Sequence, residues 1–155
     1  MKQYDVVAIG ELLIDFTQNG KSSQGNPIFE ANPGGAPCNV LAMLQKLGNN
    51  TAFIGKVGAD GFGYQLEQAL IEAGISTEGL RFDPDIHTTL AVVQTKADGD
   101  RDFSFYRNPG ADIMLREDEL SEEIIRNAKI FHFGSLSLTD DPVRTCTNRA
   151  IQIAE

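Results

Sequence analysis

The stretch Asn32-Pro33-Gly34-Gly35-Ala36-Pro37-Cys38-Asn39 runs directly into the apolar segment 40–47, which ends at Gly48. Two adjacent glycines let a backbone approach a ligand closely, because no Cβ stands in the way. Pro37 has its φ angle already suited to the start of a helix, and Gly48 is typical of the residue that ends one. Such a loop presents backbone N–H groups and the Asn39 amide at a helix N-terminus, which suits a hydroxyl-rich or anionic small molecule.

Buried strands alternate with amphipathic helices around this loop. The run Val6-Val7-Ala8-Ile9-Gly10 is short, apolar and rich in β-branched residues, which indicates a strand buried on both faces. The segment 61–73 has apolar residues at helical spacing, with Asp60 as its candidate N-cap. Further strands are expected at residues 51–57 and 129–133, and further helices at 38–47, 121–128 and from Asp141-Pro142 onward. This order predicts an α/β fold with a parallel sheet covered by helices on both faces.

Two segments, residues 12–31 and 88–107, break this alternation. In the first segment, strands at 12–17 and 27–31 flank a polar link. In the second, strands at 88–96 and 101–107 flank the hairpin turn Ala97-Asp98-Gly99-Asp100. Both segments alternate apolar and polar residues, so each should turn one face to solvent or to a partner. We interpret them as a small antiparallel layer, set apart from the main sheet, that acts as a lid.

Composition narrows the class of protein. The chain has 155 residues, the length of one domain, and a formal net charge of −9 from 22 acidic and 13 basic residues. No stripe of Lys or Arg is present, which argues against nucleic acid and anionic membranes as partners. No apolar run is long enough to span a bilayer, and the start lacks the apolar core of a signal peptide, so we expect a cytoplasmic protein. Cys38 and Cys146 have no metal-ligand spacing and are interpreted as reduced thiols.

The last expected helix has no end signal. Residues 144–155 contain no C-cap glycine, no following proline and no polar tail, so we expect the helix to continue past Glu155. A parallel sheet that stopped here would leave a strand edge of the buried type unpaired, which is an aggregation hazard. The sequence therefore predicts a truncated chain, a fragment of a longer protein.

Three features are candidates for binding chemistry, and each has a plainer alternative. Asp15 lies five residues after Gly10, where the first strand leaves the sheet. A carboxylate there can accept hydrogen bonds from two neighbouring sugar hydroxyls, but a turn-stabilising aspartate has the same position. Gly34-Gly35 with Asn39 is either a binding loop or an ordinary strand-to-helix turn. Arg107, at the end of the second hairpin, is either a ligand contact or a surface arginine.

Other motifs do not indicate a site. The glycines of residues 58–63 fall in the reverse order from the dinucleotide fingerprint, so helix capping and tight packing explain them better. No phosphate-cradling loop of the Walker type occurs. His87 and His132 are isolated, and no Ser-His-Asp or Cys-His arrangement has a credible context. A dinucleotide-binding oxidoreductase is disfavoured by the missing fingerprint.

Several motifs, in order and spacing, carry a resemblance to a known family. They are Gly10-Glu11-Leu12-Leu13-Ile14-Asp15, Pro33-Gly34-Gly35-Ala36-Pro37-Cys38-Asn39-Val40, Gly48, Gly58 and Phe105-Tyr106-Arg107-Asn108-Pro109-Gly110-Ala111-Asp112. Together they resemble the N-terminal half of the ribokinase-like (PfkB) carbohydrate kinases, most closely the bacterial fructokinases. The resemblance covers essentially the whole chain. It implies a ribokinase-like, Rossmann-type sheet with helices on both faces and a small β-lid.

The resemblance also implies roles for the candidate residues. Asp15 and Asn39 would bind sugar hydroxyls, the backbone at Gly34-Gly35 would lie against the sugar, and Arg107 would reach the substrate from the lid. The family's cofactors are ATP and Mg²⁺, and its lid often forms a homodimer contact. Lid closure would exclude water, which matters because ATP hydrolysis competes with phosphorylation of the sugar.

The family's second signature, Asp-Thr-x-Gly-Ala-Gly-Asp, does not occur in this sequence. That segment carries the catalytic aspartate, the anion hole for the transferring phosphate and most of the ATP site, so residues 1–155 alone should not catalyse. We expect the sugar-binding half of an ATP-dependent kinase, most closely a fructokinase making fructose 6-phosphate. Two alternatives stay open: a non-catalytic sugar-binding or dimerisation module, and a kinase for another sugar such as ribose or 2-keto-3-deoxygluconate.

Overall fold

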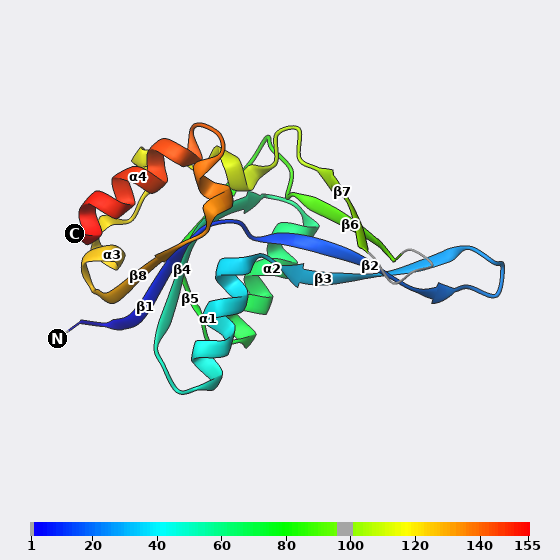
Figure 1. Ribbon diagram of the computed structural model, residues 1–155, viewed down its shortest axis with the longest axis horizontal. Coiled ribbons are helices and arrows are strands. Elements are labelled where there is room, and N and C mark those ends of the chain that lie inside the picture. Colours follow the sequence, from blue (N-terminus) through cyan, green and yellow to red (C-terminus); the bar gives the residue numbers. More distant parts are fainter. Residues whose placement is uncertain (1, 96–100) are drawn as a thin grey trace.

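A computed structural model describes residues 2–95 and 101–155 and confirms the α/β class (Figure 1). Its main sheet has four parallel strands in the order β5-β4-β1-β8. These strands are β1 (Tyr4–Ile9), β4 (Thr51–Gly58), β5 (Ser76–Asp83) and β8 (Ala128–Phe133). The helices are α1 (Ala36–Lys46), α2 (Gly61–Glu72), α3 (Glu122–Arg126) and α4 (Val143–Ala154), with 3-10 turns η1 (Ala111–Met114), η2 (Glu117–Glu119) and η3 (Ser135–Leu138). Among the described residues, no helix is both long and apolar enough to cross a membrane.

Helices cover the main sheet on both faces, as predicted (Figure 1). Val6 and Ala8 belong to the cluster that packs under α1 and α2, whereas Val7 and Ile9 belong to the cluster under α3 and α4. Successive strand residues point to opposite faces, so a strand buried on both sides needs an uninterrupted apolar run. The apolar run of β1 is therefore explained by burial of the strand on both faces, as the sequence predicts.

Two helix boundaries, the start of α2 and the end of α1, follow the capping signals predicted for them. The Asp60 side chain accepts a hydrogen bond from the Gly63 N–H at 2.8 Å and caps α2, and Gly48 has the left-handed φ of +85° just after α1. The helix expected at residues 121–128 is shorter, because β8 already begins at Ala128. The strand β5 was not expected from the sequence. It pairs in parallel with β4 and is mostly half-buried, so its pattern lacks the continuous apolar run of β1.

A second sheet extends away from the main body as an arm (Figure 1). Its strand order is β3-β2-β6-β7, formed by β2 (Leu13–Lys21), β3 (Pro27–Gly34), β6 (Leu90–Thr95) and β7 (Arg101–Tyr106). Both predicted hairpins are present, and the expected turn at residues 97–100 lies outside the described residues.

The expectation of a purely antiparallel layer was wrong. Strands β2 and β6 pair in parallel, with Ile14 opposite Leu90. Both strands leave the main sheet at the same edge, β2 after β1 and β6 after β5, and those two parent strands run in the same direction. The arm is therefore a mixed sheet of two hairpins.

Candidate functional site

The site lies where β1 ends and the chain passes into the arm, at the carboxyl edge of the main sheet. In open α/β sheets this edge is where ligands bind. Asp15 lies on β2 beside the end of β3, where Gly34 precedes helix α1. A Cβ built on Gly34 would overlap Oδ2 of Asp15, so the carboxylate lies directly against the glycine backbone. The structure thus brings together the first two predicted site elements.

The Asp15 carboxylate is partly buried and lacks a hydrogen-bond donor among the described residues. Burial raises its pKa above the usual aspartate value, and no hydrogen bond from the described part of the chain offsets that burial. A carboxylate in this state loses water without gaining a protein partner. Hydroxyl groups of a ligand could supply the missing hydrogen bonds.

The chain turns sharply between β3 and α1, at a segment that we call the glycine turn (Gly34, Gly35 and Ala36). Gly35 has a φ of +125°, and a Cβ there would overlap the backbone carbonyl oxygen of Glu11. Both the conformation and the close approach therefore require glycine. Glu11 is itself buried, and its Oε1 accepts a hydrogen bond from the Ala36 N–H at 2.9 Å.

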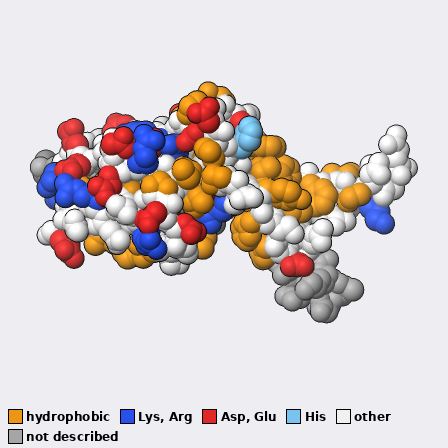
Figure 2. All heavy atoms as spheres, turned by 90° about the horizontal axis from the view of Figure 1, so that it is seen from above, with side chains coloured by type: hydrophobic (Ala, Val, Ile, Leu, Met, Phe, Trp, Pro, Cys, Tyr) orange, Lys and Arg blue, Asp and Glu red, His pale blue; other side chains and the backbone are white. Residues whose placement is uncertain are grey.

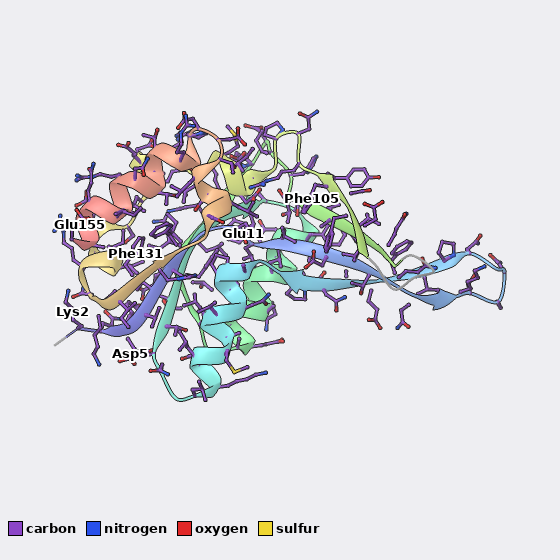
Figure 3. All side chains as sticks on the ribbon, viewed as in Figure 1. Lys2, Asp5, Glu11, Phe105, Phe131 and Glu155 are labelled. Atoms are coloured by element: carbon purple, nitrogen blue, oxygen red, sulfur yellow. The ribbon has the colours of Figure 1, made fainter. Side chains whose placement is uncertain are left out.

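Sequence reasoning gave Glu11 no role. It stands between Gly10 and the apolar run 12–14, and an acidic residue in such surroundings is a signal of a buried, bonded carboxylate. Figure 3 shows Glu11 at the junction of the main sheet and the arm.

Asn39 lies one turn into α1, and its backbone N–H donates to the Gly35 carbonyl at 3.1 Å. Its side chain is exposed and lines a groove of about 270 Å³ between α1 and α2, together with Gly34, Cys38 and Leu66. Asn39 and Gly34 therefore share one groove, as a binding loop would require.

Arg107 is held in a buried ion pair. Its Nε and Nη2 atoms donate to the Asp112 carboxylate at 3.2 and 2.6 Å, and Thr89 Oγ1 donates to the same carboxylate at 2.5 Å. Asp112 is 2% exposed, so this bidentate pair is shielded from water. The guanidinium is therefore held in place by Asp112, whereas a contact of Arg107 with a ligand stays a prediction.

Arg107 does not share a cavity with the other candidates. It lines a separate hollow of about 750 Å³ between the arm and the start of α2, with Phe62, His87 and Tyr106. Among the described residues that line this hollow, none is Asp15, Gly34, Gly35 or Asn39. The structure therefore places Asp15 against Gly34, and Gly34 with Asn39 in one groove that neither Asp15 nor Gly35 lines among the described residues, and it leaves Arg107 apart.

The glycine-rich segment 58–63 serves packing, as predicted. Asp60 accepts hydrogen bonds from the Gly63 N–H and the Thr88 N–H, both at 2.8 Å. A Cβ on Gly63 would overlap the carbonyl oxygen of Gly58. Within residues 2–95 and 101–155, no group of three or more His, Cys, Asp or Glu side chains is placed to hold a metal ion.

Comparison with known proteins identifies the family of this chain. The sequence profile described as pfkB family carbohydrate kinase matches residues 3–155. The chain belongs to this family. It is 47% identical to fructokinase-1 of Zea mays over 152 residues, which is 97% of this chain and 47% of that protein. The chain thus spans about half the length of the curated relatives it matches.

Solved structures agree with the family assignment. A fructokinase from Xylella fastidiosa superposes with a TM-score of 0.91 at 35% identity, over 99% of this chain and 47% of that one. A second structure of the Xylella fastidiosa enzyme, with bound ATP, has a TM-score of 0.88 at 34% identity, over 99% and 46% of the two chains. The ribokinase-like fold expected from the sequence is confirmed.

Stability against pH tests the state of Asp15. Its folded pKa is raised, so Asp15 contributes stability at low pH that is lost as the pH rises through the folded pKa. Asp15→Asn should therefore gain stability relative to wild type between pH 3 and pH 7, measured as the urea midpoint of the complete protein.

Asp5 is a control of opposite sign. Its pKa is lowered, first by the Asn50 N–H and then by Lys129, so its contribution is lost as the pH falls. Asp5→Asn should lose stability relative to wild type as the pH rises. If Asp15→Asn followed wild type at every pH, the carboxylate would not be desolvated as described.

Proposed function

We propose that this chain is the sugar-binding half of an ATP-dependent fructokinase, which transfers the γ-phosphoryl group of ATP to the 6-hydroxyl of fructose. The observation that carries the proposal is the partly buried Asp15 carboxylate, which lies against Gly34 without a donor from the described residues. The family and the fructokinase relatives support the reaction class and the sugar.

The electrostatics favour a neutral, hydroxyl-rich ligand over an anionic one. Helix N-termini attract anions, but the N-terminus of α1 already has the Glu11 carboxylate on its Ala36 N–H. Asp15 adds a second carboxylate beside the same turn, and the net charge of the chain is −9. Of the hydroxyl-rich and the anionic ligand that the sequence left open, these charges favour the hydroxyl-rich one, and we propose a sugar before phosphorylation.

The proposed roles follow from position. Asp15 accepts hydrogen bonds from two neighbouring hydroxyls and orients the sugar, the glycine turn lets the sugar approach the backbone, and Asn39 adds an amide from α1. Arg107, which is paired with Asp112, is proposed to contact the substrate from the lid. We propose that the segments 12–31 and 88–107 form a lid whose closure excludes water.

ATP is the proposed phosphate donor, and the ATP-bound structural relative supports this choice. Mg²⁺ is proposed from the family alone. By the same resemblance, we propose that its ligands and the catalytic aspartate lie in the second half of the kinase domain. Both cysteines are buried free thiols, which fits the reducing cytoplasm where we place the protein.

Replacing Asp15 tests this function. Two charge-assisted hydrogen bonds contribute roughly 1.5–3 kcal/mol each, so Asp15→Ala in the complete enzyme should lower kcat/KM for fructose by about 100-fold or more. The measurement is ADP formation coupled to fructose phosphorylation. Asp118→Ala, which removes an exposed carboxylate on η2, is the matched control and should retain wild-type kinetics. Wild-type KM and kcat in Asp15→Ala would refute the assignment of the site.

We also propose that the lid forms a homodimer contact. Phe103 and Phe105 are 48% and 56% exposed and stack on each other, and the arm carries a band of hydrophobic side chains (Figure 2). The strand register places Asp15, Ala91 and Phe105 in one row on the same face of the arm. A partner seated on this face would help to enclose the sugar.

Sedimentation velocity tests the dimer. The complete protein should sediment as a dimer and Phe103→Glu as a monomer, because a charge in the apolar contact costs several kcal/mol. Ile71→Glu, at a 52% exposed position on α2, is the matched control and should stay dimeric. A dimer that persists in Phe103→Glu would contradict the proposed contact.

A further inference from the structure

Helix α1 begins without a cap of its own. Its N-cap residue is Gly35, which has no side chain, and its first turn contains no acidic residue. Ala36 is the first residue of the helix and holds its first N–H donor, and Pro37, which follows it, has none. Exposed donors at a helix start need an acceptor from elsewhere.

Glu11 supplies that acceptor from the end of β1, 25 residues earlier in the chain. The residue is 5% exposed, and its Oε1 is 2.9 Å from the Ala36 nitrogen. The backbone of residue 11 also touches the turn, because a Cβ on Gly35 would overlap the Glu11 carbonyl oxygen. Glu11 therefore contacts the glycine turn twice, at Ala36 through its side chain and at Gly35 through its backbone carbonyl.

The second carboxylate oxygen, Oε2, is buried and has no hydrogen-bond partner in the described part of the chain. It lies against Gly134 at the end of β8, where a Cβ would come within 2.9 Å. A side chain at position 134 would therefore collide with Oε2. Replacing Oε2 by the amide nitrogen of a glutamine breaks no hydrogen bond among the described residues.

The position of the glycine turn sets the contact with Asp15. Gly34 touches the Asp15 carboxylate, and only Gly35 separates it from Ala36. We propose that Glu11 is a positioning residue, which fixes the glycine turn against Asp15 by capping α1 and so sets the affinity for the sugar. This inference rests on the proposed function for its effect on the sugar, but not for the cap itself.

Two variants of the complete protein distinguish the effect of side-chain length at position 11 from the effect of its charge. Glu11→Gln keeps an oxygen that reaches the Ala36 N–H and removes the charge, whereas Glu11→Asp keeps the charge and is one methylene too short. Fructose KM in Glu11→Asp should rise about tenfold, the loss of one buried hydrogen bond, with kcat within about threefold of wild type. Glu11→Gln should stay within about threefold of wild type in both constants.

Hydrogen exchange at the Ala36 amide, measured by NMR, is independent of activity. The exchange rate should increase about tenfold in Glu11→Asp and stay near wild type in Glu11→Gln, since this amide loses its acceptor only in the first variant. Unchanged exchange in Glu11→Asp, or equal impairment of both variants, would overturn the proposal. If the wild-type protein did not phosphorylate fructose, the proposed function would fail, while the exchange rates would still decide the role of Glu11.

Discussion

The glycine turn lies so close to the backbone of Glu11 and to the carboxylate of Asp15 that no side chain fits between them. This close approach joins three elements, namely the end of β1, strand β2 and the start of α1. Because β1 is in the middle of the main sheet and buried on both faces, its end is a rigid reference point. The position of Asp15 therefore depends on the packing of the whole α/β core.

The arm contributes to the candidate site at this same junction, because Asp15 lies on its strand β2. Strands β2 and β6 leave the body at one edge and pair in parallel, so the two hairpins form one sheet. Asp15 belongs to the body end of this sheet, and Arg107 follows the end of β7 on the other hairpin. The strand register aligns Asp15 with Phe105, two residues before Arg107, so both candidates lie at the same end of one sheet.

Much of this architecture could be predicted because its causes are local. The apolar run of β1, the Asp60 cap and Gly48 each depend on neighbouring residues, and each was found as expected. The parallel pairing of β2 with β6 could not be predicted, because it depends on the directions of two strands far apart in the chain. The strand β5 was missed for a related reason, since pairing with β4 rather than its own pattern makes it a strand.

The candidate site divides in the same way. Asp15, the adjacent glycines Gly34 and Gly35, and Asn39 were all named from the sequence, and the resemblance to the family gave them roles in sugar binding. The bond from the Ala36 N–H to Glu11 spans 25 residues, and only the folded chain makes it visible. Arg107 and Asp112 are only five residues apart, but the enclosure of their pair by Thr89 and Gly110 is visible only in the folded chain.

The central claim is that Asp15 is a desolvated carboxylate completed by sugar hydroxyls. The most direct test is an NMR titration of its carboxyl carbon in the complete protein, with and without saturating fructose. Without sugar, the pKa should lie above the usual aspartate value, because burial disfavours the charge. With fructose, the pKa should fall, since hydroxyl donors stabilise the ionised form. A pKa of Asp15 that is the same with and without bound fructose would contradict the account.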